Sequence, residues 1–162
     1  KSAVGRRLAE RLGLPFVDAD SEIEEAAGCS IDDIFERFGE AAFREGERRV
    51  MARLLDGPPQ VLATGGGAFI DPETRERVRA AGVSVWLSAD LNTLYERVMR
   101  RQGRPLLRQD DPRAVLVRLL DERGPIYAEA DIVVESEAGP ISRTVDKVEG
   151  AVRAHLAKAA AR

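Results

Sequence analysis

Cysteine and histidine are almost absent from this sequence. Cys29 is the only cysteine and His155 the only histidine in 162 residues, which excludes an intrachain disulfide and a zinc site built from these two residue types. A histidine-dependent catalytic triad is also disfavoured, because His155 lies in a polar, alanine-rich tail that is typical of a solvated helix end. Disulfide scaffolds, zinc proteins and histidine-dependent hydrolases are therefore disfavoured.

An excess of one charge and a long apolar run are also missing. Charged residues make up 33% of the chain but the net charge is only −3, so neither a polyanion-binding surface nor a membrane-seeking face is favoured. No apolar run approaches the roughly 18 residues of a membrane span, and no signal-peptide core is found. We expect a single cytoplasmic domain over residues 1–162, with neither a nucleic acid nor a membrane as partner.

What the sequence does contain is an apolar run that ends in three consecutive glycines. Residues 61–63 suit a strand buried on both faces, and Thr64 leads from them into the glycines at 65–67. A backbone without side chains can be approached closely by a ligand, and its N–H groups can point at a ligand oxygen. A flexible strand exit would give the same pattern, so the function of the triplet depends on the charged stretches that could converge on it.

Strand and helix patterns alternate along the chain. Strands are predicted over residues 15–20, 61–63, 83–87 and 132–135, and helices over residues 3–12, 20–27, 30–38, 40–55, 71–81, 90–102, 113–127 with a break at 123–125, and 141–160. Residues 103–112 are rich in glycine, proline and charge and are predicted to form a mobile loop. The alternation indicates an α/β fold, a mostly parallel sheet with helices on both faces, whose ligands bind beyond the carboxyl ends of the strands.

Four short motifs lie at that edge of the predicted sheet, and two more come later in the chain. They are Lys1-Ser2, Asp18-x-Asp20, Phe43-Arg44-x-x-Glu47, Gly65-Gly66-Gly67, Arg104-Pro105-Leu106-Leu107 and Arg123-x-Pro125-x-Tyr127. In this order and at this spacing, from Lys1 to about Pro140, the chain closely resembles the shikimate kinases. The resemblance implies a P-loop fold of the nucleoside monophosphate kinase type with strand order 2-3-1-4-5. It also implies transfer of the γ-phosphoryl group of ATP to the 3-hydroxyl of shikimate, which gives shikimate 3-phosphate and ADP in aromatic amino acid biosynthesis.

The same resemblance implies the residues of the phosphate and metal site. Lys1, Ser2 and Ala3 match the end of a phosphate-binding loop, with the Lys1 ammonium against the β and γ phosphates and the Ser2 hydroxyl on Mg²⁺. Asp18 would hold Mg²⁺, through water. Without the resemblance, Asp18 and Asp20 could equally be helix caps at the surface.

Three further positions match the rest of the nucleotide site. Arg104 would lie on a lid at about residues 103–112 and stabilise the transferred phosphoryl group, although the residue alone suggests only a solvated loop charge. Arg97 would pack against adenine, with Pro140 near the other side of the ring.

On the acceptor side, the resemblance assigns the binding of shikimate. Asp20 would accept hydrogen bonds from the shikimate hydroxyls and take the proton of the attacking 3-hydroxyl, while Arg44 and Arg123 would bind the carboxylate. Glu47 would orient Arg44, and its plain alternative is an exposed i,i+3 ion pair. Gly65 would let the substrate lie against the end of the strand. The backbone N–H groups of Gly66 and Gly67 would donate hydrogen bonds to the substrate.

The sequence departs from the family pattern at its start. The first strand and the Gly-x-x-Gly-x-Gly part of the phosphate loop are absent, so either the chain begins inside a longer protein or that loop has been left out of it. A protein that began at Lys1 should bind ATP poorly, because it would lack the N–H groups that hold the β phosphate. A monomer is expected.

Two other functions stay open at this point. One is a related small-molecule kinase that acts on gluconate or a nucleoside monophosphate. The other is a kinase-like domain that senses a ligand in a regulator. The presence of Lys1, Asp18, Asp20 and Arg104 together favours catalysis over this alternative.

Overall fold

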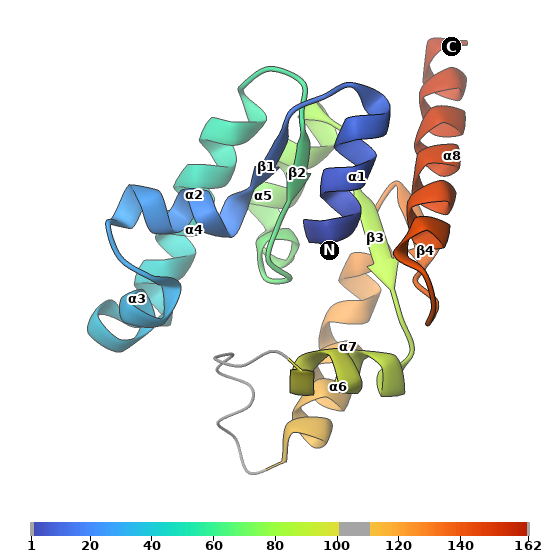
Figure 1. Cartoon of the computed structure of the whole chain (residues 1–162). Helices are drawn as coiled ribbons and strands as arrows, with labels where there is room; N and C mark the ends of the chain where they lie inside the picture. The colour runs from blue at the N-terminus through green and yellow to red at the C-terminus, as the bar shows by residue number, and fades with distance from the viewer. Residues whose placement is uncertain (1, 101–110, 162) are drawn as a thin grey trace.

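The computed structural model describes residues 2–100 and 111–161, and its helices and strands alternate as the sequence predicts (Figure 1). The elements are α1 (Ser2–Leu12), β1 (Phe16–Asp18), α2 (Ala19–Ala27), α3 (Ile31–Phe38), α4 (Glu40–Leu55), β2 (Val61–Ala63), the 3-10 helix η1 (Ala68–Ile70), α5 (Pro72–Ala81), β3 (Val85–Ser88), α6 (Leu91–Arg100), α7 (Pro112–Tyr127), β4 (Ile132–Glu135) and α8 (Ile141–Ala160). None of the helices within these residues combines the length and the apolar composition needed to cross a bilayer.

The strands form two parallel pairs. β1 pairs with β2, with Asp18 opposite Ala63, and β3 pairs with β4, with Ser88 opposite Glu135. A cavity of about 590 Å³ lies between β2 and β3 and is lined by both. The pairs correspond to strands 2-3 and 4-5 of the predicted order, and the cavity lies where that order places strand 1.

The residues of β2 alternate between two apolar cores. Val61 packs against the core formed by α1, α8 and β4, whereas the next residue, Leu62, packs against the core formed by α2, α3 and α4. Neighbouring strand residues point to opposite faces, so the expected helices on both faces of the sheet are confirmed. Figure 1 shows α8 beside β4 and the group α2 to α4 on the other side of the β1–β2 pair.

The structure buries β2 less fully than the sequence predicts. All three of its residues are only half-buried, as are those of β1 and β3. The reason for β2 and β3 is the cavity between them, which leaves part of each strand without packing partners.

The second half of the chain differs from the sequence prediction at α7. Asp111 caps this helix and Pro112 begins it, so these two residues belong to the helix end and not to the predicted loop. The helix also runs through Pro125 without the predicted break, although a proline inside a helix removes one backbone hydrogen bond. The buried positions of this helix are Val115 and Leu116, whereas Val117 is 39% exposed.

Candidate functional site

The carboxyl ends of β1 and β2 lie side by side. Because Asp18 pairs with Ala63 in a parallel register, the segment after β1, which begins α2, and the segment after β2, which holds the glycine triplet, leave the sheet at the same edge. Ligands of parallel α/β sheets bind at this edge. The candidate site is therefore built on the first turn of α2 and on residues 64–67.

Asp18 makes contacts with both of its carboxylate oxygens. Its Oδ1 accepts hydrogen bonds from the backbone N–H groups of Asp20, at 2.9 Å, and Ser21, at 3.4 Å, and so caps α2. Its Oδ2 accepts a hydrogen bond from the Ser2 hydroxyl at 3.0 Å. This arrangement joins the start of α1 to the start of α2.

The predicted strand through Asp20 is wrong. The strand ends at Asp18, and Asp20 lies in the first turn of α2. An aspartate at the end of a strand can accept the otherwise unpaired N–H groups of a following helix, so the strand ends two residues earlier than predicted and the helix begins one residue earlier, at Ala19. Asp18 and Asp20 are thus linked by the hydrogen bond that caps the helix, and they do not lie together on one strand.

Two glycines of the triplet contact the candidate side chains closely. A Cβ on Gly65 would lie 3.2 Å from Asp20 Oδ1, and a Cβ on Gly67 would lie 2.6 Å from the guanidinium carbon of Arg44. The second distance is shorter than real Cβ contacts, so only glycine fits beside Arg44 as it is placed. The structure therefore brings Asp20 and Arg44 to one turn, as the sequence analysis expects.

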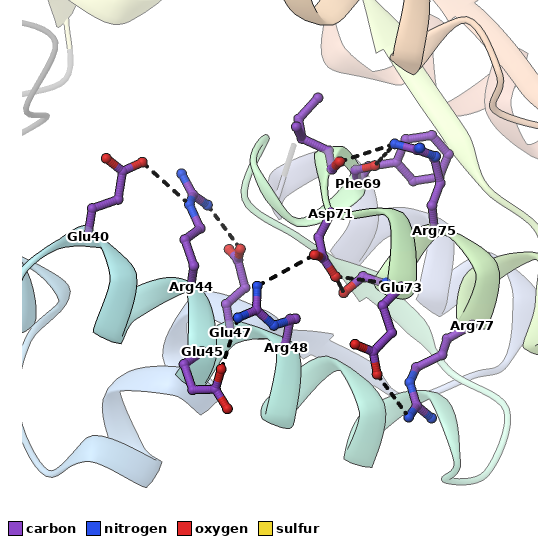
Figure 2. A network of polar contacts seen from close by, with 12 residues as sticks. Glu40, Arg44, Glu45, Glu47, Arg48, Phe69, Asp71, Glu73, Arg75 and Arg77 are labelled. Carbon is purple, nitrogen blue, oxygen red and sulfur yellow. Dashed lines mark hydrogen bonds and ion pairs between the residues drawn. The ribbon is translucent and has the colours of Figure 1, made fainter.

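Arg44 is held by a buried carboxylate. Its Nη1 donates to Glu47 Oε1 at 2.9 Å, and Figure 2 shows this pair on α4 with Glu40 on the outer side, 3.7 Å from Arg44 Nε. Glu47 is only 3% exposed. Burial raises the pKa of Glu47, the Arg44 guanidinium opposes this effect, and the charges of Asp20 and Asp71 add to it. The alternative of an exposed surface ion pair is therefore wrong.

The turn after the glycines is fixed by residues that the sequence analysis did not assign to the site. Arg75 Nη1 donates to the carbonyl oxygens of Phe69 and Ile70, each at 3.1 Å, and Arg48 Nη1 lies 3.5 Å from Asp71 Oδ1 (Figure 2). Asp71 also caps α5 by accepting from Thr74. Burial would raise the pKa of Asp71, but the hydrogen bonds from Thr74 and the charge of Arg48 outweigh burial and lower it.

All three carbonyl oxygens of the triplet accept hydrogen bonds. Gly65 O accepts from Ala68 N at 3.3 Å and Gly67 O from Ile70 N at 3.2 Å. Gly66 O accepts from the hydroxyl of Tyr127 at 2.6 Å. Within residues 2–100 and 111–161, by contrast, the N–H groups of Gly66 and Gly67 donate to no protein atom. Backbone donors at such a turn are available to a ligand.

For the remaining candidate residues, the structure gives their place in the fold and, for Arg97, one contact. Arg123 lies in α7, one helical turn before Tyr127, so the two share a face of the helix. Arg97 Nη2 donates to Ser136 Oγ at 2.9 Å, and Pro140 precedes α8 a few residues later. Ala3 lies in the first turn of α1.

Two of the predicted catalytic residues cannot be placed. Lys1 and Arg104, with most of the predicted lid at 103–112, fall outside the described residues. Their predicted roles stay untested.

The oxygen donors at Ser2 and Asp18 fit a magnesium ion. Magnesium is bound by hard oxygen ligands, through one or two carboxylates together with water and substrate phosphates. The adjacent hydroxyl and carboxylate of this pair supply such donors. Nowhere in the described ranges do three histidine, cysteine, aspartate or glutamate side chains form a ready-made metal cluster, and a magnesium site of this kind needs none.

A parallel α/β sheet with a glycine turn, carboxylates and an arginine at its carboxyl edge places the chain in the class of nucleoside monophosphate kinase-like phosphotransferases. The family model described as shikimate kinase matches residues 1–152. The chain belongs to the shikimate kinase family, and it is an ATP-dependent kinase. The resemblance seen in the sequence is confirmed.

Curated relatives and a solved structure agree with this family. The shikimate kinase of Paramagnetospirillum magneticum is 64% identical over 153 residues, which cover 94% of this chain and 78% of the relative. The shikimate kinase of Bradyrhizobium diazoefficiens is 56% identical over 156 residues, which cover 96% of this chain and 75% of the relative. The structure of shikimate kinase from Acinetobacter baumannii in complex with shikimate matches with a TM-score of 0.90 and 37% identity, over 94% of this chain and 86% of that one. These names favour the shikimate kinase interpretation over the gluconate kinase and ligand-sensor alternatives.

Proposed function

We propose that the turn of residues 65–67, with the side chains around it, is where the acceptor shikimate binds and receives the γ-phosphoryl group of ATP at its 3-hydroxyl. One observation carries the assignment to this site. The carboxylate of Asp20 and the guanidinium of Arg44 both lie against the same glycine turn, beside Gly65 and Gly67 respectively. A small acidic alcohol needs such a pair, a carboxylate for its hydroxyls and a guanidinium for its carboxylate.

Arg44 is suited to bind the shikimate carboxylate. A planar guanidinium matches a planar carboxylate with two parallel hydrogen bonds, which a lysine cannot supply. Glu47 is buried and holds one edge of the guanidinium through Nη1, so the remaining N–H groups keep a fixed direction. Arg123 supplies a second guanidinium from α7.

Asp20 is suited to orient the acceptor hydroxyl. The 3-hydroxyl oxygen of shikimate attacks the γ-phosphorus of ATP, the bond from that phosphorus to the bridging oxygen breaks, ADP leaves with that oxygen, and the hydroxyl proton passes to the Asp20 carboxylate. Phosphoryl transfer requires little proton chemistry. Positioning of the hydroxyl is therefore the larger part of the contribution of Asp20.

The nucleotide side of the proposal begins at the contact between Ser2 and Asp18. These two residues would hold Mg²⁺, which neutralises phosphate charge when it is bound. Further nucleotide contacts are proposed for Lys1, Ala3, Arg97, Arg104 and Pro140. We also propose that the enzyme works as a monomer in the cytoplasm on a small-molecule acceptor.

The proposal is tested by a coupled ADP-release assay with ATP, Mg²⁺ and a panel of acceptors that contains shikimate, gluconate and a nucleoside monophosphate. We expect turnover with shikimate alone, and equal rates with shikimate and gluconate would contradict the assignment. Asp20→Asn should abolish turnover and leave the fold intact. Asp32→Asn, which changes an exposed aspartate in the first turn of α3, is the matched control and should keep full activity. An active Asp20→Asn enzyme would show that Asp20 has another role.

A further inference from the structure

Among the described residues of the six motifs, Tyr127 is the one that forms a contact with the glycine turn and has no role in the scheme above. Its hydroxyl donates to the carbonyl oxygen of Gly66 at 2.6 Å, across 61 positions of sequence. The ring of Tyr127 packs against the ring of Trp86 on β3, with centroids 5.6 Å apart and an interplanar angle of 41°. Tyr127 is thus held at its ring by the sheet and reaches the turn with its hydroxyl.

The hydrogen bond to Gly66 fixes a peptide unit, because the carbonyl of Gly66 and the N–H of Gly67 belong to the same planar group. No described peptide bond is cis, so the N–H of Gly67 points away from the carbonyl and therefore away from Tyr127. This N–H donates to no protein atom of the described residues. The hydroxyl of Tyr127 therefore sets the direction of a donor at the turn that also contacts Asp20 and Arg44.

Tyr127 also links this turn to α7. The helix packs against η1, which directly follows the triplet. Arg123, which lies one turn earlier on the same helix, is carried by the same element. One phenol hydroxyl thus connects the segment with the backbone donors to the helix with the second guanidinium.

We propose that Tyr127 is a positioning residue of the acceptor site, which sets the orientation of the Gly66–Gly67 peptide and the distance of α7 from the glycine turn. The proposal rests on the proposed function, in which the N–H groups of this turn and Arg123 bind the acceptor. Without the hydroxyl, the peptide is free to rotate and shikimate must bring it into place on binding. The loss should appear as weaker binding of shikimate, while binding of ATP stays unchanged.

The first experiment observes the peptide itself. Among the 14 glycines of this sequence, one glycine follows another only at 65–66 and 66–67. A protein labelled with ¹³C-carbonyl, ¹⁵N-glycine therefore gives only two carbonyl-to-amide correlations from these residues, and one of them joins Gly66 C=O to Gly67 N–H. We expect Tyr127→Phe to shift this correlation, and Tyr95→Phe, which changes the only other tyrosine, to leave it in place. An unmoved correlation in Tyr127→Phe would overturn the proposal.

The second experiment separates positioning from packing. Tyr127→Phe keeps the ring against Trp86, so we expect the melting temperature to fall by no more than a few degrees, the effect of one lost hydrogen bond. The KM for shikimate should rise by roughly fivefold to tenfold, the effect of one neutral hydrogen bond. The KM for ATP should stay within twofold of wild type. Trp86→Phe reduces the ring contact but keeps the hydroxyl, and its KM for shikimate should stay within twofold of wild type. Equal rises in both variants would overturn the proposal, because the effect would then come from packing.

The outcomes also separate this proposal from the proposed function. If the wild-type protein fails to phosphorylate shikimate, the proposed function fails, while the labelling experiment still tests the contact between Tyr127 and Gly66. If the wild-type protein phosphorylates shikimate and Tyr127→Phe keeps its KM, only the role of Tyr127 is refuted.

Discussion

Replacement of Glu47 by glutamine tests the buried ion pair beneath the proposed acceptor site. The side chain is 3% exposed and accepts a hydrogen bond from Arg44 Nη1 at 2.9 Å. Glutamine has nearly the same shape and can still accept that bond through its amide oxygen. The substitution therefore removes the charge and leaves the packing.

The magnitude follows from the kind of hydrogen bond that is lost. A bond to a charged group contributes roughly 1.5–3 kcal/mol and a neutral one roughly 0.5–1.5 kcal/mol, so the hold on Arg44 weakens by about 1 kcal/mol. This corresponds to a KM for shikimate raised by roughly fivefold. The value of kcat should change less, because the proposed role of Arg44 is to bind the carboxylate and not the reacting hydroxyl.

Stability should respond in a different way from substrate binding. Breaking a fully buried ion pair costs roughly 3–5 kcal/mol because one charge is left without a partner. The Arg44 side chain is 28% exposed, so its charge reaches water and the cost here is smaller. A buried amide is also less costly than a buried carboxylate. We expect the free energy of unfolding of Glu47→Gln to stay within about 1 kcal/mol of wild type, the range of an ordinary substitution.

The pH dependence has a definite sign. Burial raises the pKa of Glu47 above its ordinary 4.5, against the opposing effect of Arg44. The folded protein thus holds this proton more tightly than the unfolded chain, and wild type loses stability as the pH rises from 4.5 through the folded pKa. Glutamine does not titrate, so the melting temperature of Glu47→Gln relative to wild type should increase over that range.

The assay is a pair of measurements, the KM for shikimate in the coupled assay and melting curves between about pH 4 and pH 7, the range around an ordinary carboxyl pKa. Glu45→Gln is the control, since Glu45 lies on the same helix and pairs with Arg48 and Arg49 but its side chain is 52% exposed. The control should be neutral in both measurements. A Glu47→Gln enzyme with an unchanged KM for shikimate would refute the idea that Glu47 orients Arg44.

Two further substitutions test the same site. Gly67→Ala should raise the KM for shikimate by about tenfold or more, the factor of 1.4 kcal/mol, because the new Cβ would displace the guanidinium of Arg44. The backbone there is helical with φ −76° and suits alanine, so any loss of stability comes from the pair of Arg44 with the buried Glu47 and not from the backbone. Gly46→Ala, with open space around its Cβ, is the control, and a normal KM in Gly67→Ala would contradict the placement of Arg44. Arg123→Ala should weaken shikimate binding, measured by titration calorimetry, by roughly 1.5–3 kcal/mol, whereas Arg118→Ala, which removes an exposed arginine of the same helix, should have no effect; a change in ATP affinity alone would move Arg123 to the nucleotide side.

Much of the fold could be predicted because its signals are local. Caps and glycines mark where helices begin and end: Ser30 accepts from Asp33 N, Asp71 accepts from Thr74 N, and Gly28 ends α2 with a φ of 73°. The strand at Val61–Ala63 was likewise predicted at its observed bounds. Each of these features depends on a few neighbouring residues, so the sequence alone is sufficient.

The parts that were wrong or missed depend on contacts between distant segments. The burial of Glu47 follows from the packing of α4 against α2 and α5. Glu47 lies on the same helix face as the buried Phe43, Val50 and Met51, whereas Glu45 does not, so the helical spacing was a local signal that the sequence analysis did not use. The hydrogen bond from Tyr127 to Gly66 likewise joins two motifs that are far apart in sequence. The end of β1 was misplaced for a local reason, because Asp18 can belong to a strand and cap a helix at once.

The two roles of Asp18 have a thermodynamic consequence. One of its oxygens accepts from Ser2, on the proposed nucleotide side of the site, and the other accepts from the backbone N–H of Asp20. Any ligand that immobilises Asp18 therefore also steadies the first turn of α2 and lowers the entropy lost when an acceptor binds there. Linkage is reciprocal, so acceptor and nucleotide should each tighten the binding of the other, and a single carboxylate would be the point at which the two affinities are coupled.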